Sequence, residues 1–270
     1  MTLFEAVILG IVQGLTEFLP ISSSGHLVLG EFLLEVKFDD ISFEVFLHFG
    51  TFLSVVVVFR RNIWSMARAV WLKVRSVLTG VAAARGSEDL HLVWMIFVGS
   101  LPAGLAGLLF KSYVEASFSS VLLVSIMLLF TGTALFLTRF FRAGRVRLKW
   151  GDALLVGLAQ ALAMLPGVSR SGLTISTAIF ARVDRSRAAE FSFLLSLPAI
   201  LGASLVELKD VSSQANPGSH LGIYLVGAAT AFAVGYLAIK FLLEVIRKGK
   251  FQYFAYYCLA VGLLFLIFAR

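Results

Sequence analysis

The stretch QGLTEFLPISSSGH, residues 13–26, decides how this chain is expected to fold. An apolar helical pattern is broken at Pro20, and three serines then lead to His26. The apolar segments on either side, residues 3–19 and 27–34, are interrupted or too short for a span, which needs about 20 apolar residues. Two half-helices meeting at a polar turn are typical of a re-entrant hairpin, whose irregular backbone requires cover by protein or a wet cavity.

A second stretch of the same design, QALAMLPGVSRSGLT, occupies residues 160–174. Pro20 and Pro166 lie 146 positions apart, as do Glu44 and Glu190. Because a polar, helix-breaking loop recurs at matching places in the two halves, we expect one site that is built from both loops.

The composition indicates a polytopic membrane protein. The 270 residues are 59% hydrophobic and 14% charged, whereas soluble domains have roughly 25% charged residues, and the mean hydropathy is +0.92. The one cysteine, Cys258, lies in the last apolar run, so neither a disulfide nor a thiolate metal site is expected. The N-terminus carries Glu5 and no basic residue before the apolar run, so no cleavable signal peptide is expected.

Six longer apolar runs are expected to span the membrane. They are residues 41–59, 90–110, 118–138, 188–206, 221–243 and 251–268. The loops on one side of these spans hold 17 of the 23 Lys and Arg residues, which predicts that this side is cytoplasmic. The net charge of +7 therefore indicates membrane orientation and no nucleic-acid partner, because the cations sort by side of the bilayer.

This alternation places both chain termini outside and predicts that the two hairpins enter from opposite faces. The expected fold is an all-α integral membrane protein, one membrane domain over residues 1–270 with an inverted-topology repeat. Each half, about residues 1–140 and 147–270, has one re-entrant helix hairpin and three transmembrane helices. Residues 63–78, with two tryptophans among basic residues, predict a helix on the membrane surface, and a solvated basic loop is the alternative.

Arg170, in the second broken stretch, would lie in the apolar region. A lone arginine there costs about 2.5–3.5 kcal/mol on insertion scales. An ion pair with a buried carboxylate would offset this cost, and Glu17, Glu44 and Glu190 are the candidates.

The neighbours of Arg170 favour an anion site in addition to an ion pair. Ser169 and Ser171 flank it, Thr174 follows, and a helix expected to start near Gly172 would point amide hydrogens at the loop. An arginine fork, hydroxyl groups and a helix N-terminus together suit phosphate.

The first loop supplies groups with which phosphate can react. Residues 22–24 offer three hydroxyl nucleophiles, and His26 is close enough in sequence to act as base or acid. Glu17 has three candidate roles: orienting the histidine, taking a proton or holding a divalent cation. Gln13, one turn earlier, is limited to hydrogen bonding, and for His48 a structural hydrogen bond is the favoured role. One serine capping the second half-helix is the alternative interpretation, but it does not account for all three.

Together, the two stretches resemble the signature motifs of the undecaprenyl-pyrophosphate phosphatase family, the bacitracin-resistance phosphatases. The resemblance covers the whole chain, including FEVFLHFGT around Glu44 and EFSFLLSLPA around Glu190. It implies a multi-pass enzyme of the bacterial plasma membrane, whose site opens to the outer face. Such an enzyme converts undecaprenyl pyrophosphate into inorganic phosphate and undecaprenyl phosphate, the lipid carrier for peptidoglycan and other envelope polymers.

The same resemblance implies roles for single residues. The nucleophile position falls on Ser23, the motif histidine on His26, the acidic position on Glu17 and the phosphate-binding arginine on Arg170. The further residues expected at the substrate phosphates are Ser169, Ser171, Thr174, Gln13 and Ser24. A divalent cation, Mg or Ca, is implied by the resemblance alone, with Glu17 as its candidate ligand.

Three alternatives stay open at this point. Ser24 or an activated water competes with Ser23 for the nucleophile role. A lipid-phosphate or small-anion transporter would use the same inverted repeat and phosphate grip without chemistry, although it would not need the serine, histidine and carboxylate. The oligomeric state is open, with a homodimer as one alternative.

Overall fold

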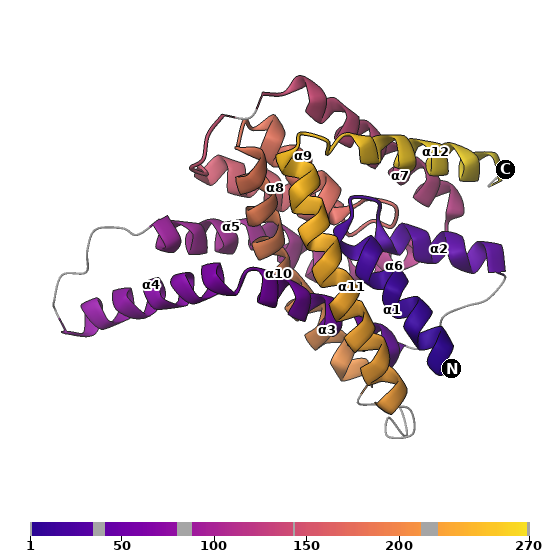
Figure 1. Ribbon diagram of the computed structural model, residues 1–270, viewed down its shortest axis with the longest axis horizontal. Helices are drawn as coiled ribbons and strands as arrows, with labels where there is room; N and C mark the ends of the chain where they lie inside the picture. The colour runs from indigo at the N-terminus through magenta and orange to yellow at the C-terminus, as the bar shows by residue number, and fades with distance from the viewer. Residues whose placement is uncertain (1, 35–40, 80–87, 143, 212–220, 269–270) are drawn as a thin grey trace.

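The computed structural model describes residues 2–34, 41–79, 88–142, 144–211 and 221–268, and within them the chain is helical (Figure 1). An isolated β-bridge joins Arg145 to Val183. The helices are α1 (Leu3–Phe18), α2 (Ser23–Leu34), α3 (Ile41–Val58), α4 (Arg60–Thr79), α5 (Glu88–Leu109), α6 (Lys111–Ser117), α7 (Val121–Leu137), α8 (Trp150–Leu162), α9 (Arg170–Phe180), α10 (Arg185–Val211), α11 (Leu221–Arg247) and α12 (Tyr253–Phe268).

The apolar helices are those of a membrane protein. In the described part of the chain, α5, α11 and α7 with the turn that follows it (Val121–Phe140) are long and apolar enough to cross a bilayer. A bent pair, α3 and α4, would add a fourth crossing, and α8 and α12 are apolar but shorter. The six expected spans all fall on helices, namely α3, α5, α7, α10, α11 and α12.

Both half-helices after the breaks begin earlier than the sequence predicted. The apolar segment after the first break is expected from residue 27 and the second helix from near Gly172, whereas α2 begins at Ser23 and α9 at Arg170. The second helix therefore begins two residues before Gly172, near the expected start. The cause is a capping serine in each loop, since a serine side chain satisfies an amide of the first turn that has no partner within the helix.

The two caps have the same form. Ser22 Oγ accepts from the Gly25 amide at 3.2 Å, and Ser169 Oγ accepts from the Gly172 amide at 3.1 Å. Ser22 has a φ of +70°, a left-handed conformation that is uncommon outside glycine and often occurs at functional sites. Ser23 and Arg170 thus occupy equivalent positions, each the first residue of a helix that follows a capping serine.

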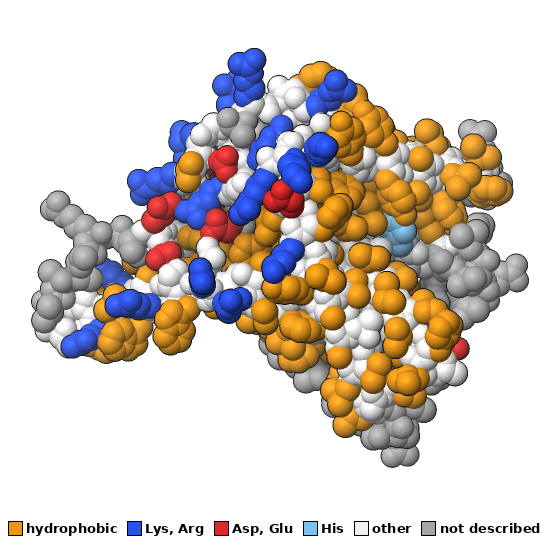
Figure 2. Space-filling view, viewed as in Figure 1, with side chains coloured by type: hydrophobic (Ala, Val, Ile, Leu, Met, Phe, Trp, Pro, Cys, Tyr) orange, Lys and Arg blue, Asp and Glu red, His pale blue; other side chains and the backbone are white. Residues whose placement is uncertain are grey.

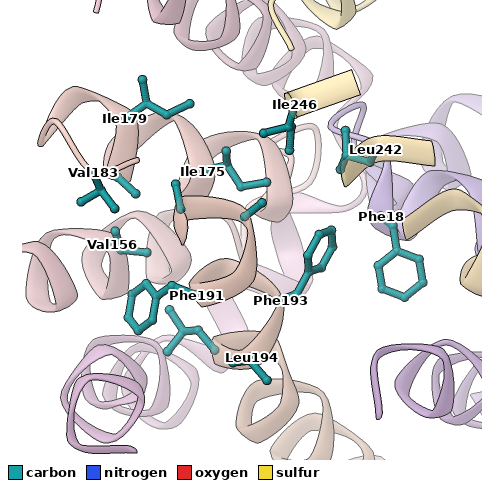
Figure 3. Close-up of a cluster of buried hydrophobic side chains, with 14 of the residues drawn as sticks. Phe18, Val156, Ile175, Ile179, Val183, Phe191, Phe193, Leu194, Leu242 and Ile246 are labelled. Carbon is teal, nitrogen blue, oxygen red and sulfur yellow. The ribbon is translucent and has the colours of Figure 1, made fainter. Parts of the chain in front are cut away.

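The main core joins the second hairpin to helices from both halves (Figure 3). Ile175 and Ile179 of α9 are fully buried against α10 and α11 residues such as Phe193 and Leu242. Phe18, the last residue of α1, meets Phe193 edge to face at 5.9 Å between ring centroids. The end of the first half-helix, just before Pro20, is therefore anchored on the helix that supports the second loop.

The two broken loops touch each other. A Cβ at Gly25 would lie 3.0 Å from the Gly167 Cα atom, and a Cβ at Gly172 would lie 3.2 Å from the Pro20 Cβ atom. Glycine is required at such positions because any side chain would separate the backbones. The two broken loops, at the tips of the pairs α1–α2 and α8–α9, therefore form one contact.

We expect Gly167→Ala to destabilise the protein by about 3 kcal/mol or more. Gly167 has a φ of +89°, and an added Cβ would lie 2.4 Å from the Val124 carbonyl oxygen. The left-handed conformation costs about 1–2 kcal/mol in any L-residue, and overpacking adds about 1–3 kcal/mol. Gly249→Ala is the matched control, since Gly249 has a φ of +67° with nothing within 4 Å. Thermal melts in detergent should show the larger loss for Gly167; equal losses would contradict a tight loop contact.

Cations gather at one end of the molecule, in the upper left of the view in Figure 2, while hydrophobic side chains cover much of the rest. Several of these cations are paired with acids. Arg187 contacts Glu88 at 2.5 Å and Glu190 at 2.9 Å, and Arg145 contacts Asp152 at 2.9 Å. The 17 cations expected on one membrane side include both of these arginines.

The basic segment after α3 is helical, so the alternative of a basic loop is wrong. α4 leaves α3 at an angle of 76°. It exposes Trp64 (74%) and Trp71 (57%), and Met66 is its buried residue. Its position on the membrane surface stays a prediction, which this exposed apolar face supports.

Candidate active site

The Glu17 carboxylate, at the end of α1, connects the two loops. Its Oε1 atom forms an ion pair with the Arg170 guanidinium, and its Oε2 atom accepts from Ser23 Oγ at 2.9 Å. The Glu17 side chain is only 8% exposed and that of Arg170 is 19% exposed. Of the three carboxylates considered for Arg170, the structure therefore selects Glu17, and Glu190 pairs with Arg187 instead.

Gln13 holds the carboxylate from the preceding turn. Its Nε2 atom donates to Glu17 Oε2 at 3.2 Å and lies 3.3 Å from His48 Nδ1 on α3. Gln13 was expected at the substrate phosphates, but its hydrogen bonds here orient Glu17. The structural hydrogen bond expected for His48 is present, and it connects α3 to this network.

The three serines of the first loop have different partners. Ser22 is the helix cap, and its Oγ lies 3.4 Å from Ser24 Oγ. Ser23 is the one of the three whose hydroxyl donates to a carboxylate. The interpretation that one serine serves as a cap is thus correct for Ser22, and it leaves Ser23 joined to Glu17.

His26 lies one turn into α2, and both of its ring nitrogens have hydrogen-bond partners other than Ser23. Its Nδ1 atom is 2.7 Å from the Ser22 carbonyl oxygen, and its Nε2 atom is 2.6 Å from the Tyr257 hydroxyl on α12. Because a carbonyl oxygen only accepts, Nδ1 carries the proton and Nε2 accepts from Tyr257. The two rings are nearly parallel, at 11°, with centroids 5.6 Å apart.

The second loop is fixed from α7. Thr131 Oγ1 donates to the Gly167 carbonyl and accepts from the Ser169 amide, both at 3.1 Å. Ser169 Oγ caps α9 and lies 3.3 Å from Ser171 Oγ. Ser169 and Ser171 are 2% and 4% exposed, so both lie beneath the tip, close to Arg170 in sequence and position.

Two residues singled out in the sequence have no hydrogen bond to the side chains of Gln13, Glu17, Ser23 or Arg170. Thr174 is fully buried, and its hydroxyl pairs with Arg170 O and Ser192 Oγ at 2.6 Å each, a packing role between α9 and α10. Gln160, the counterpart of Gln13, is 3% exposed, and its amide has no hydrogen-bond partner in the described part of the chain. The structure thus brings Gln13, Glu17, Ser23 and Arg170 together and leaves Thr174 outside.

Sequence reasoning missed Tyr257 and Thr131. Tyr257 lies 231 residues after His26, within an apolar helix where a tyrosine has no distinguishing pattern. Thr131 lies in α7, where a hydroxyl usually bonds to its own helix. No periodicity or spacing would have singled out either residue.

The carboxylates at the site do not form a metal centre by themselves. In the described ranges, no group of three or more His, Cys, Asp and Glu side chains is placed to hold a metal ion. Both oxygens of Glu17 already have partners, namely Arg170, Ser23 and Gln13. A divalent cation would therefore need most of its ligands from outside the protein.

Comparison with known proteins matches this chain over almost its whole length. The family described as bacitracin resistance protein BacA matches residues 6–264. An undecaprenyl-diphosphatase of Desulforapulum autotrophicum is 42% identical over 273 residues, which cover 99% of this chain and 98% of that protein. The undecaprenyl-diphosphatase of Halothermothrix orenii is 44% identical, with 100% of this chain and 99% of that protein covered. The undecaprenyl-diphosphatase of Methanobrevibacter smithii is 43% identical, with 98% of this chain and 96% of that protein covered. The chain belongs to the bacitracin resistance protein BacA family.

Proposed function

We propose that this protein is an undecaprenyl-diphosphatase, which hydrolyses undecaprenyl pyrophosphate to undecaprenyl phosphate and inorganic phosphate. Family membership and full-length relatives of that name support the activity. The observation that carries the chemistry is the Glu17 carboxylate, which bonds to a hydroxyl of the first loop and to a guanidinium of the second. A nucleophile, a base and an anion-binding cation thus share one site.

Phosphate binding would use Arg170 together with the ends of two helices. The guanidinium has five N–H donors, so donors remain after its pairing with Glu17. Helices α2 and α9 both begin at the tip contact, where their dipoles favour negative charge. Ser24 is half-buried beside Ser23 and remains a proposed phosphate contact, whereas Ser169 and Ser171 would act mainly by shaping this helix end.

Ser23 would be the nucleophile, with Glu17 as its base. As Ser23 Oγ bonds to the terminal phosphorus, its proton passes to Glu17 Oε2, 2.9 Å away. The bond from phosphorus to the bridging oxygen breaks, and undecaprenyl phosphate leaves with the electron pair. Water would then attack the phosphorus of the phosphoserine and give up a proton to His26 Nε2, which exchanges its bond to Tyr257 for one to this water. The bond between phosphorus and Ser23 Oγ breaks, and Ser23 Oγ takes back the proton held by Glu17 as inorganic phosphate leaves.

A divalent cation stays part of the proposal without a step assigned to it. Mg²⁺ in enzymes of phosphates typically binds one or two carboxylates, substrate oxygens and water. At this site Glu17 would be its protein ligand, and the pyrophosphate would provide further oxygens. Its chemistry would be the neutralisation of charge on the phosphates.

We expect Tyr257→Phe to lower kcat by about fivefold and leave KM nearly unchanged, which is the effect of losing about 1 kcal/mol from one neutral hydrogen bond. The variant keeps the ring that stacks on His26 but removes the donor to Nε2. Tyr256→Phe is the control, because Tyr256 contacts Phe136 and Tyr253 instead. Steady-state phosphate release measures both constants. A KM effect alone, or equal effects of the two variants, would contradict a positioning role for Tyr257.

The inverted repeat is also proposed, and helix packing supports it. In the first half, α1 and α3 both pack on α11 of the second half. In the second half, their counterparts α8 and α10 both pack on α5 of the first half. The close approaches match as well: a Cβ at Gly10 would lie 2.7 Å from Gly227 O, and one at Gly157 would lie 2.3 Å from Gly99 O. In this arrangement the hairpins enter from opposite faces, the termini lie outside, and the site opens to the outer face of the plasma membrane.

The proposed function is tested by phosphate release from C55 or C15 pyrophosphate with purified protein in detergent. We expect turnover, measured with and without added Mg²⁺ or Ca²⁺ to assess the cation. A carrier that merely moves lipid phosphate would release none, and this result would overturn the assignment. Size-exclusion chromatography with light scattering on the same sample tests the homodimer.

A further inference from the structure

A cationic recess, separate from the candidate active site, lies where α3 bends into α4 beside α11. It has a volume of about 270 Å³ and is lined by Val58, Arg60, Arg61, Tyr236 and Lys240. Three of these five residues are cations, and none is an acid. The 76° bend between α3 and α4 carries the two arginines toward α11. The recess is smaller than typical pockets for drug-sized ligands, which span roughly 300–1,000 Å³, and is of the right order for a small anionic group.

The part of the chain that the structure describes does not neutralise the charges in this recess. In the described residues, Arg60, Arg61 and Lys240 have no carboxylate within ion-pair distance. Other cations of the basic end differ, since Arg187 and Arg145 are paired with acids. Like charges that converge without acids raise the local affinity for an anion.

Two contacts orient side chains that line the recess. Arg60 Nη1 donates to the Val57 carbonyl at 2.9 Å, at the end of α3. Lys240 Nζ lies over the Tyr236 ring, 4.4 Å from its centroid, so the ring forms a wall beside the ammonium group. The remaining donors of these side chains, and those of Arg61, are available to a ligand.

The recess opens beside a surface suited to lipid. α4 starts at Arg60 and exposes Trp64, Trp71 and Leu78, the last at 80%. Aromatic and aliphatic side chains among cations are typical of helices that lie at the boundary between head groups and acyl chains. Basic pockets between helices on the cytoplasmic side often bind the head groups of anionic lipids.

We propose that this recess binds the phosphate head group of an anionic membrane phospholipid. The phosphodiester would lie between Arg61 and Lys240, and its acyl chains would extend over the apolar face of α4. The site would hold the bend between α3 and α4 against the membrane. It uses none of the residues of the candidate active site.

The test is binding of phosphatidylglycerol to the full-length protein in detergent, measured by native mass spectrometry over a lipid titration. We expect saturable binding that R61Q/K240Q weakens by about 30-fold, since each cation near an anionic lipid contributes roughly fivefold. R68Q/K73Q removes two cations from α4 outside the lining and should weaken binding less than threefold. The charge-preserving R61K/K240R variant should bind nearly normally, which separates charge from folding.

Competitors identify the source of the phosphate. Phosphatidylcholine should not displace phosphatidylglycerol, because its head group has no net negative charge. Millimolar inorganic phosphate should not displace it either, because it lacks a membrane anchor. Displacement by inorganic phosphate would overturn the lipid assignment. Equal losses for R61Q/K240Q and R68Q/K73Q would show general surface attraction, and absence of saturable binding to the wild-type protein would show no site; either result would reject the proposal.

Discussion

Arg170→Ala is expected to reduce the rate of phosphate release by more than two orders of magnitude. Arg170 is the cation that joins the two loops, and its side chain is largely buried. Donors that stabilise developing charge in a transition state are worth about 10²–10³ in rate each. The substitution also leaves the Glu17 carboxylate buried without its counter-charge, which costs about 3–5 kcal/mol in comparable cases. Activity on C15 pyrophosphate in detergent measures the effect.

Three further variants separate catalysis from folding. Arg170→Lys keeps the charge but loses the planar fork, so an intermediate loss is expected. The double variant Glu17→Gln with Arg170→Ala removes both charges of the pair and should recover the melting temperature but not the activity. Arg139→Ala, at an exposed arginine on the protein surface, should be nearly neutral. If Arg170→Ala kept near-normal turnover, the phosphate assignment would be wrong.

Ser23→Ala is expected to lower the rate by at least about a thousandfold, because the attacking atom itself is removed. Ser23 Oγ is the hydroxyl of the first loop that already donates to Glu17. Ser24→Ala should cost only a few-fold, since Ser24 Oγ has Ser22 Oγ as its partner. Acid quench during turnover, followed by mass spectrometry of the peptide that contains residues 22–26, should show one added phosphate on Ser23.

The same pair of variants decides between the open mechanisms. A severe loss in Ser24→Ala with a mild loss in Ser23→Ala would move the nucleophile by one residue. Mild losses in both, with no phosphorylated peptide, would indicate direct attack by water. In that case Glu17 would act as the base that activates the water, and Glu17→Gln would cause the largest loss in rate.

The sequence predicts well that the two broken loops meet, because broken helices in a membrane leave few alternatives. Pro20 and the serines after it break the helix, so a turn covered by protein is expected there. Arg170 lies in an apolar region, so an ion pair with a carboxylate is expected. The structure shows the turn and the pairing of Arg170 with Glu17. Sequence alone allowed three acids, since the choice depends on how α1 and α9 meet, and Phe18 against Phe193 fixes that geometry.

The finer arrangement depends on contacts that have no local pattern. The early starts of α2 and α9 depend on whether Ser22 and Ser169 turn their hydroxyls to the backbone. The orientation of His26 depends on Tyr257, which a distant helix brings to it. The sequence placed His26 close to Ser23, whereas in the structure Ser23 Oγ bonds to Glu17 and the two ring nitrogens of His26 bond to the Ser22 carbonyl and to Tyr257.

Ser23 and Arg170 occupy equivalent positions, as the first residues of α2 and α9. An ancestor with one hairpin per gene, pairing as two identical subunits, would have presented the same side chain from both sides. Two serines would lack the cation, and two arginines would lack the attacking group. In the proposed inverted repeat, two loops of different sequence within a single polypeptide therefore supply the hydroxyl and the cation together.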